Sequence, residues 1–159
     1  MNPPFEFAPE LVVARDQLFA YDWNEEEKQP RVRTSADGVK WSDAKPIYKK
    51  PFYLWGVMYD PVSDEFWAPP HAIPSKAAVE GRQIHLIRSK DGVQWDYVST
   101  VAPFNNSSES VLRFDKDRTM TVLVRRKYGS TVTVATAKPP YTDWQMSDLP
   151  VIAEGHHFF

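Results

Sequence analysis

The sequence contains no cysteine, and only six of its 159 residues are glycine. Without cysteine the chain can form neither a disulfide nor a thiolate zinc site, and it has no cysteine nucleophile. Its first residues, MNPPFEFAPE, lack the basic region and the long apolar stretch of a secretory signal, so we expect a cytoplasmic protein. No apolar run approaches the roughly 18 residues of a membrane-spanning helix, and we therefore expect no membrane partner.

An excess of charge of either sign is also lacking. The chain carries 19 Lys and Arg against 21 Asp and Glu, which gives a formal net charge of −2. This balance offers no broad basic surface for nucleic acid. The four histidines show no metal-ligand spacing, and the chain has no glycine-rich phosphate loop. We expect no nucleic-acid partner, no metal and no cofactor.

Aromatic residues and proline, in contrast, are abundant: six Trp, seven Tyr, nine Phe and 14 Pro. Aromatic and β-branched residues favour strands, and prolines interrupt them. Segments such as QIHLIRS (83–89) and STVTVATA (130–137) have the alternation or the β-branched density of strands, whereas helical periodicity is almost absent. The sequence therefore predicts an all-β protein of short strands.

An internal repeat organises these strands. TSADGVKW (34–41) returns as RSKDGVQW (88–95), and both follow the pattern S-x-D-G-V-x-W. TAKPPYTDW, which ends at Trp144, is interpreted as a degenerate third copy. A period of about 50 residues with several strands in each unit is typical of β-propeller blades. We predict about three four-stranded antiparallel blades, near 10–50, 51–102 and 103–150, within a single domain of residues 1–159.

Each repeated box predicts a hairpin turn. Ser35 and Asp37 can accept hydrogen bonds from nearby backbone amides, and Gly38 can adopt the positive φ of a tight turn. Trp41 would then cover the hairpin with its ring. The second box offers the same residue types, namely Ser89, Asp91, Gly92 and Trp95. We predict that both boxes are structural and bind no ligand.

These boxes resemble the Asp-box, or BNR repeat, of the sialidase superfamily. LWGVMYD (54–60), SSESVLRFD (107–115) and EGHHFF (154–159) follow in the order of motifs found in sialidase-like proteins. The resemblance implies a propeller that usually has six blades, of which this chain would supply half. Relatives commonly carry Arg at the position of Gly56, where it helps to grip an acidic sugar, and its absence argues against acidic-sugar binding.

The resemblance also suggests site residues. A sialidase-like hydrolase would need an Arg cluster, a Tyr nucleophile with its Glu, and an Asp acid/base. Glu109 matches the Asn-Glu-Thr-like motif of the family and is the candidate catalytic residue. Each candidate also has a structural interpretation, such as blade packing or a solvated surface position. The predicted ligand-binding residues are Arg15, Asp16, Trp55, Tyr59, His71, Glu109, Arg125 and Tyr128.

The sequence leaves three functions open. The first is a sialidase-like propeller protein that binds itself and carbohydrate, without a complete glycosidase site in one chain. The second is a glycoside hydrolase whose active site forms in the channel of a closed homodimer. The third is a non-functional fragment of a longer propeller. The missing Arg at Gly56 favours the first over the second, so we expect a binding protein rather than an enzyme.

Overall fold

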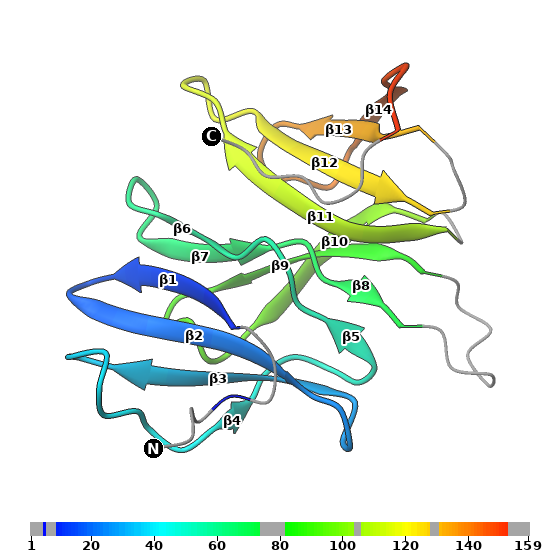
Figure 1. Ribbon diagram of the computed structural model, residues 1–159. Coiled ribbons are helices and arrows are strands. Elements are labelled where there is room, and N and C mark those ends of the chain that lie inside the picture. Colours follow the sequence, from blue (N-terminus) through cyan, green and yellow to red (C-terminus); the bar gives the residue numbers. More distant parts are fainter. Residues whose placement is uncertain (1–4, 6–8, 74–81, 104–105, 128–130, 153–159) are drawn as a thin grey trace.

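The computed structural model describes residues 5, 9–73, 82–103, 106–127 and 131–152 (Figure 1). Within these residues the chain forms strands and turns only, so this part of it contains no helix that could cross a membrane. The strands gather into three antiparallel sheets that lie one after another along the chain. The all-β prediction is confirmed.

The first and third sheets are simple four-stranded meanders. In each of them every strand pairs with the next one along the chain, so the earliest strand lies at one edge. The first sheet contains β1 (Glu10–Ala14), β2 (Gln17–Asn24), β3 (Gln29–Ser35) and β4 (Lys45–Pro46). The third contains β11 (Ser107–Phe114), β12 (Met120–Arg126), β13 (Thr133–Ala137) and β14 (Gln145–Asp148).

The middle sheet has six strands rather than the four expected. They are β5 (Phe52–Tyr53), β6 (Met58–Asp60), β7 (Glu65–Ala68), β8 (His71–Ala72), β9 (Ile84–Ser89) and β10 (Asp96–Ala102). β5 pairs with β8, and β6 pairs with β7. Two strand positions of the sheet are therefore each occupied by two short strands, namely β5 and β6 at the edge and β8 and β7 beside them. The break between β7 and β8 lies at Pro69 and Pro70, which cannot donate a backbone hydrogen bond to the ladder.

Side chains that alternate along the strands build two cores. Phe19, Tyr21 and Phe66 are buried between the first and middle sheets. Trp67, the neighbour of Phe66, points the opposite way and is buried between the middle and third sheets. On the first sheet's other face, Leu11 is 59% exposed and Val13 is 68% exposed. The middle sheet is thus covered on both faces.

The first box forms a turn held by its own side chains. Ser35 Oγ accepts a hydrogen bond from the Gly38 amide at 2.9 Å, and Asp37 Oδ1 accepts from the amides of Val39 and Lys40 at 2.8 Å each. These amides lower the pKa of the Asp37 carboxyl. Gly38 has a φ of +72°, which glycine adopts without strain. The turn is therefore satisfied without a ligand.

The second box forms the same turn with equivalent hydrogen bonds. Ser89 Oγ accepts from the Gly92 amide at 2.8 Å, and Asp91 Oδ1 accepts from the amides of Val93 and Gln94 at 2.8 and 2.7 Å. Gly92 has a φ of +74°. Unlike the first turn, the second packs against another sheet, because the Tyr21 hydroxyl on β2 donates to the Gly92 carbonyl at 3.0 Å.

Candidate functional site

The edge strands of the three sheets meet around Gly56, which lies between β5 and β6. A Cβ at this position would lie 2.4 Å from the Ser110 carbonyl oxygen on β11, so only glycine fits. On the side of the first sheet, the amides of Val57 and Gly56 lie near the carboxyl group of Glu10 on β1 and lower its pKa. Any larger side chain at this position would collide with the β11 backbone.

A cavity of about 250 Å³ lies close to this meeting point, beside the beginnings of β5 and β11. Its walls come from the middle and third sheets and combine an aromatic ring, an imidazole and charged groups. The volume lies just below the range usual for small-molecule sites. The lining residues are Tyr53, His71, Ile73, Arg82, Ser108, Glu109 and Lys127.

The aromatic ring of Tyr53 lines the cavity and packs against other rings. The ring of Tyr53 stacks on Trp55, with 6.4 Å between centroids and 24° between planes. Its other neighbours are Trp23, at 5.3 Å, and His71, at 5.5 Å. Rings packed in this way are held in place and present a flat apolar surface. Such a surface suits the apolar face of a sugar ring.

The opposite wall carries charge. Glu109 on β11 forms an ion pair with Arg125 on β12. Burial raises the pKa of Tyr53, and the negative charges of Glu109 and Glu10 raise it further. Tyr53 therefore stays a neutral hydroxyl between two carboxyl groups at neutral pH.

His71 is a buried polar group that faces several cations. Its Nδ1 has no hydrogen-bond partner among the described residues. Burial lowers its pKa to about 3, with further lowering by Arg82, Lys127 and Arg125. The imidazole is therefore neutral at physiological pH and keeps one unsatisfied nitrogen. Buried nitrogens of this kind are costly unless a ligand or water pairs with them.

Glu10 lies near enough to Tyr53 to raise its pKa, and it was not among the residues that the sequence predicts. It opens β1, and its Oε2 is buried without a hydrogen-bond partner in the described part of the chain. Burial raises the pKa of this carboxyl to about 7, although the amides of Val57 and Gly56 oppose the shift. A carboxyl group that titrates near neutrality can both donate and accept a proton. In the sequence, the signal for Glu10 was an acidic residue at the start of the otherwise apolar segment ELVVA.

The residues predicted to bind ligand fall into two groups. Trp55, His71, Glu109 and Arg125 lie at or beside the cavity. Three others lie at the opposite ends of the edge strands, namely Arg15, Asp16 and Tyr59. Tyr128 lies outside the described residues.

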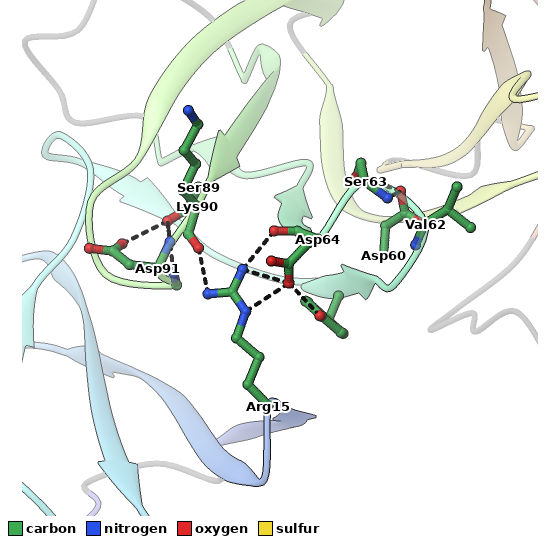
Figure 2. Close-up of polar contacts among 10 residues, drawn as sticks. Arg15, Asp60, Val62, Ser63, Asp64, Ser89, Lys90 and Asp91 are labelled. Carbon is green, nitrogen blue, oxygen red and sulfur yellow. Dashed lines mark hydrogen bonds and ion pairs between the residues drawn. The ribbon is translucent and has the colours of Figure 1, made fainter.

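Arg15 links turns of neighbouring sheets at that opposite end (Figure 2). It follows β1 and donates to Asp64 Oδ1 at 2.8 Å and to the Lys90 carbonyl at 2.7 Å. The Tyr59 hydroxyl donates to the same Asp64 oxygen at 2.6 Å. Asp16 is the next residue of the Arg15 turn and has a φ of +57°. Arg15 and Tyr59 thus make contacts at this end and lie apart from the cavity that Glu109 lines.

Metal binding finds no support in the geometry. Among the described residues, no three His, Asp or Glu side chains lie close enough together to hold a metal ion. The chemistry of the cavity comes from carboxyl groups, an imidazole, cations and aromatic faces.

Comparison with known proteins identifies the fold. No family model matches the sequence, and no curated protein matches it significantly. Among solved structures, an exo-β-1,3-galactanase from Clostridium thermocellum is 13% identical with a TM-score of 0.64, covering 91% of this chain and 37% of its own. The Phanerochaete chrysosporium exo-β-1,3-galactanase bound to β-1,3-galactotriose is 11% identical with a TM-score of 0.63, covering 92% and 39%.

A third similar structure is the N-acetylgalactosamine deacetylase from F. plautii in complex with blood group B trisaccharide. It is 18% identical with a TM-score of 0.57, and the match covers 82% of this chain and 45% of that one. The chain thus spans less than half the length of these three proteins. All three are carbohydrate-active β-propeller proteins, so the prediction of antiparallel propeller blades is confirmed, and the chain has the fold of part of such a propeller.

Proposed function

We propose that this chain is a sialidase-like propeller protein that binds carbohydrate in the cavity between Tyr53, His71 and Glu109. The carrying observation is that the ring of Tyr53, the imidazole of His71 and the ion-paired carboxylate of Glu109 line one cavity. An apolar surface with a few placed polar groups is what small-molecule sites provide. The two box turns support the sialidase-like assignment, and the carbohydrate-active neighbours support a carbohydrate-related propeller.

The charges around the cavity favour a sugar with a carboxylate. Arg82, Lys127 and Arg125 all act on His71, whereas Glu109 is the one acidic residue among those that line the cavity. Gly56 leaves no space for the family's Arg, so the cations come from other positions. We expect an acidic sugar to bind more tightly than a neutral galactose oligosaccharide.

Calorimetric titration tests this function with sialic acid, galacturonic acid and a β-1,3-linked galactose oligosaccharide. Tyr53→Ala removes the stacked ring and should weaken binding about 3-fold to 10-fold. Tyr59→Ala is the matched control, because Tyr59 does not line this cavity and its hydroxyl donates to Asp64 at the opposite ends of the edge strands. An equal loss in both variants, or no binding of any of the sugars, would contradict the proposal.

Hydrolysis is the second candidate function, and Glu10 is the observation that favours it. Glycoside hydrolysis uses two carboxyl groups in different protonation states. Glu10 titrates near neutrality, while Glu109 is held in an ion pair with Arg125. Fluorogenic aryl glycosides test this candidate. Turnover by the wild type that is lost in both Glu10→Gln and Glu109→Gln supports an enzyme. If the wild type shows no turnover, hydrolysis is contradicted and carbohydrate binding is the remaining function.

We also propose that the propeller ring is closed by a second copy of the chain, giving six blades. The second box turn packs on β2, where a Cβ at Gly92 would lie 2.8 Å from Phe19. The equivalent Gly38 is exposed, and Val39 beside it is 74% exposed. A neighbouring blade would cover this turn, as the first sheet covers the second turn.

Light scattering distinguishes a single chain from a closed ring of two chains. A closed ring predicts twice the 18.3 kDa mass of one chain. Leu11→Glu, on the exposed face of β1, should shift the mass to that of one chain, because it places a charge in an apolar contact. A wild-type protein that stays at the mass of one chain at high concentration would contradict ring closure by a second copy.

A further inference from the structure

A second and larger cavity lies between the middle and third sheets, at the opposite ends of the edge strands. It has a volume of about 530 Å³, within the usual range for small-molecule sites. Figure 1 shows the β6–β7 and β11–β12 turns on the same side of the molecule, and these turns contribute to its walls. The lining residues are Ser63, Glu65, Trp67, Arg88, Tyr97, Val98, Arg118, Pro139, Pro140, Tyr141 and Thr142.

Trp67 lines this cavity, although its indole nitrogen is enclosed by protein. The side chain is 4% exposed, and its indole Nε1 is buried without a hydrogen-bond partner among the described residues. The ring is fixed edge-on between Tyr141, at 5.4 Å, and Phe114, at 5.8 Å. It therefore cannot turn to find a partner within the protein. A ligand in the cavity would pack against the Trp67 side chain and change the environment of the indole N–H.

Glu65 and Arg88 place an acceptor and donors at the same cavity. Their nearest charged atoms are 4.0 Å apart, which is too far for a hydrogen bond. The other guanidinium, that of Arg118, is held by Asp60 through hydrogen bonds of 3.2 and 2.6 Å. Burial alone would raise the pKa of Asp60, but Arg118 and Ser63 lower it to about 2. The charges are thus balanced in pairs, which favours a neutral ligand.

The remaining wall is apolar and fixed in position. Pro139 and Pro140 lie in the loop of the third repeat, and this loop is tied to the second sheet. The Ser99 hydroxyl donates to the Tyr141 carbonyl at 2.7 Å, and the Tyr141 hydroxyl donates to the Arg118 carbonyl at 3.2 Å. The proline rings therefore form a preorganised surface opposite the polar groups.

We propose that this second cavity binds a neutral polyhydroxylated ligand, a single uncharged sugar unit. Its hydroxyl groups pair with Glu65 and Arg88, and it packs against the Trp67 side chain. The apolar face of the sugar lies on the proline wall. The site is separate from the cavity of Tyr53 and Glu109, so it does not depend on the function proposed for that cavity.

Nitrogen-15 NMR of the full chain tests the site with D-galactose, D-glucose and glycerol as probes. The indole N–H of Trp67, assigned with Trp67→Phe, should shift saturably with a hexose and far less with glycerol. Glu65→Gln should weaken this titration about 3-fold to 10-fold through the loss of a charged hydrogen bond. Glu109→Gln is the matched control in the other cavity and should leave the Trp67 titration unchanged.

Two results would overturn this inference. One is an indole N–H of Trp67 that does not move at hexose concentrations well above millimolar. The other is a shift that is equal for glycerol and hexose and unchanged in Glu65→Gln, because it would reflect solvent rather than a site. If no sugar binds at the Tyr53 cavity but the indole N–H of Trp67 still shifts with a hexose, the proposed function is refuted and the second site is supported.

Discussion

Replacing glycine by alanine in the two box turns should have unequal effects on stability. The turns share their hydrogen bonds and their backbone angle, with φ of +72° at Gly38 and +74° at Gly92. They differ in what lies beyond the glycine. A Cβ at Gly92 would lie 2.8 Å from Phe19 Cε1 and 2.9 Å from the Tyr21 hydroxyl, whereas at Gly38 it would meet Leu18 at 3.3 Å. The comparison therefore isolates the packing of one blade on the next.

The magnitudes follow from two contributions. The left-handed backbone costs an alanine about 1–2 kcal/mol at either position. Overpacking of the interface between the first and middle sheets adds about 1–3 kcal/mol at Gly92 alone. We expect Gly38→Ala to lower the free energy of unfolding by about 1–2 kcal/mol and Gly92→Ala to lower it by about 2–5 kcal/mol.

Urea unfolding, followed by far-ultraviolet circular dichroism, measures both losses. The experiment needs a concentration at which light scattering gives the mass of one chain, so that no second copy covers Gly38. The slope of free energy against urea should stay the same in both variants, because the exposed surface on unfolding is unchanged. Equal losses in the two variants would refute the idea that the second box turn is a contact between blades.

Three further changes probe the rest of the fold and site. Gly56→Ala should prevent a native fold, because its Cβ would lie 2.4 Å from a backbone oxygen that cannot move aside; a native circular dichroism spectrum would contradict this. Asp37→Ala should lower the melting temperature and leave sugar affinity unchanged, because its bonds stay within the turn; loss of binding without loss of stability would count against a structural box. Glu10 has its pKa raised from 4.5 to about 7, so the stability contributed by its protonated form is lost as pH rises through that interval. Relative to Glu10→Gln, the wild type should lose about 3 kcal/mol of unfolding free energy between about pH 5 and about pH 8, and parallel pH profiles would show that the carboxyl is not buried.

The box turns and the sheets could be anticipated from sequence because their determinants are local. Ser35, Asp37 and Gly38 make their contacts within a few residues, and strand alternation repeats along each segment. The split of the middle sheet was not anticipated, although Pro69 and Pro70 carry the signal. Two adjacent residues without backbone donors interrupt a strand that its apolar neighbours favour.

The candidate site was only partly accessible to sequence reasoning because it depends on contacts between sheets. Glu109 stood out through its motif, whereas Glu10 gained its role when the first sheet brought it to the amides of Gly56 and Val57. Arg15 ends an edge strand, and the sequence predicts a ligand-binding role for it. In the fold it reaches Asp64 and the Lys90 carbonyl on the neighbouring sheet. The residue type indicated that Arg15 makes charged contacts, and the packing of the sheets determines which partners it contacts.

The central claim is that carbohydrate occupies the cavity beside Tyr53 and His71, and the side-chain nitrogens of the histidines report on it most directly. His71 Nδ1 has no partner among the described residues, whereas His85 Nδ1 lies 2.7 Å from the Tyr48 hydroxyl and serves as an internal control. In a nitrogen-15 NMR titration with an acidic sugar, we predict that the His71 resonance shifts saturably and that the His85 resonance stays in place. A His71 signal that does not respond, or that moves together with His85, would contradict a carbohydrate site in this cavity.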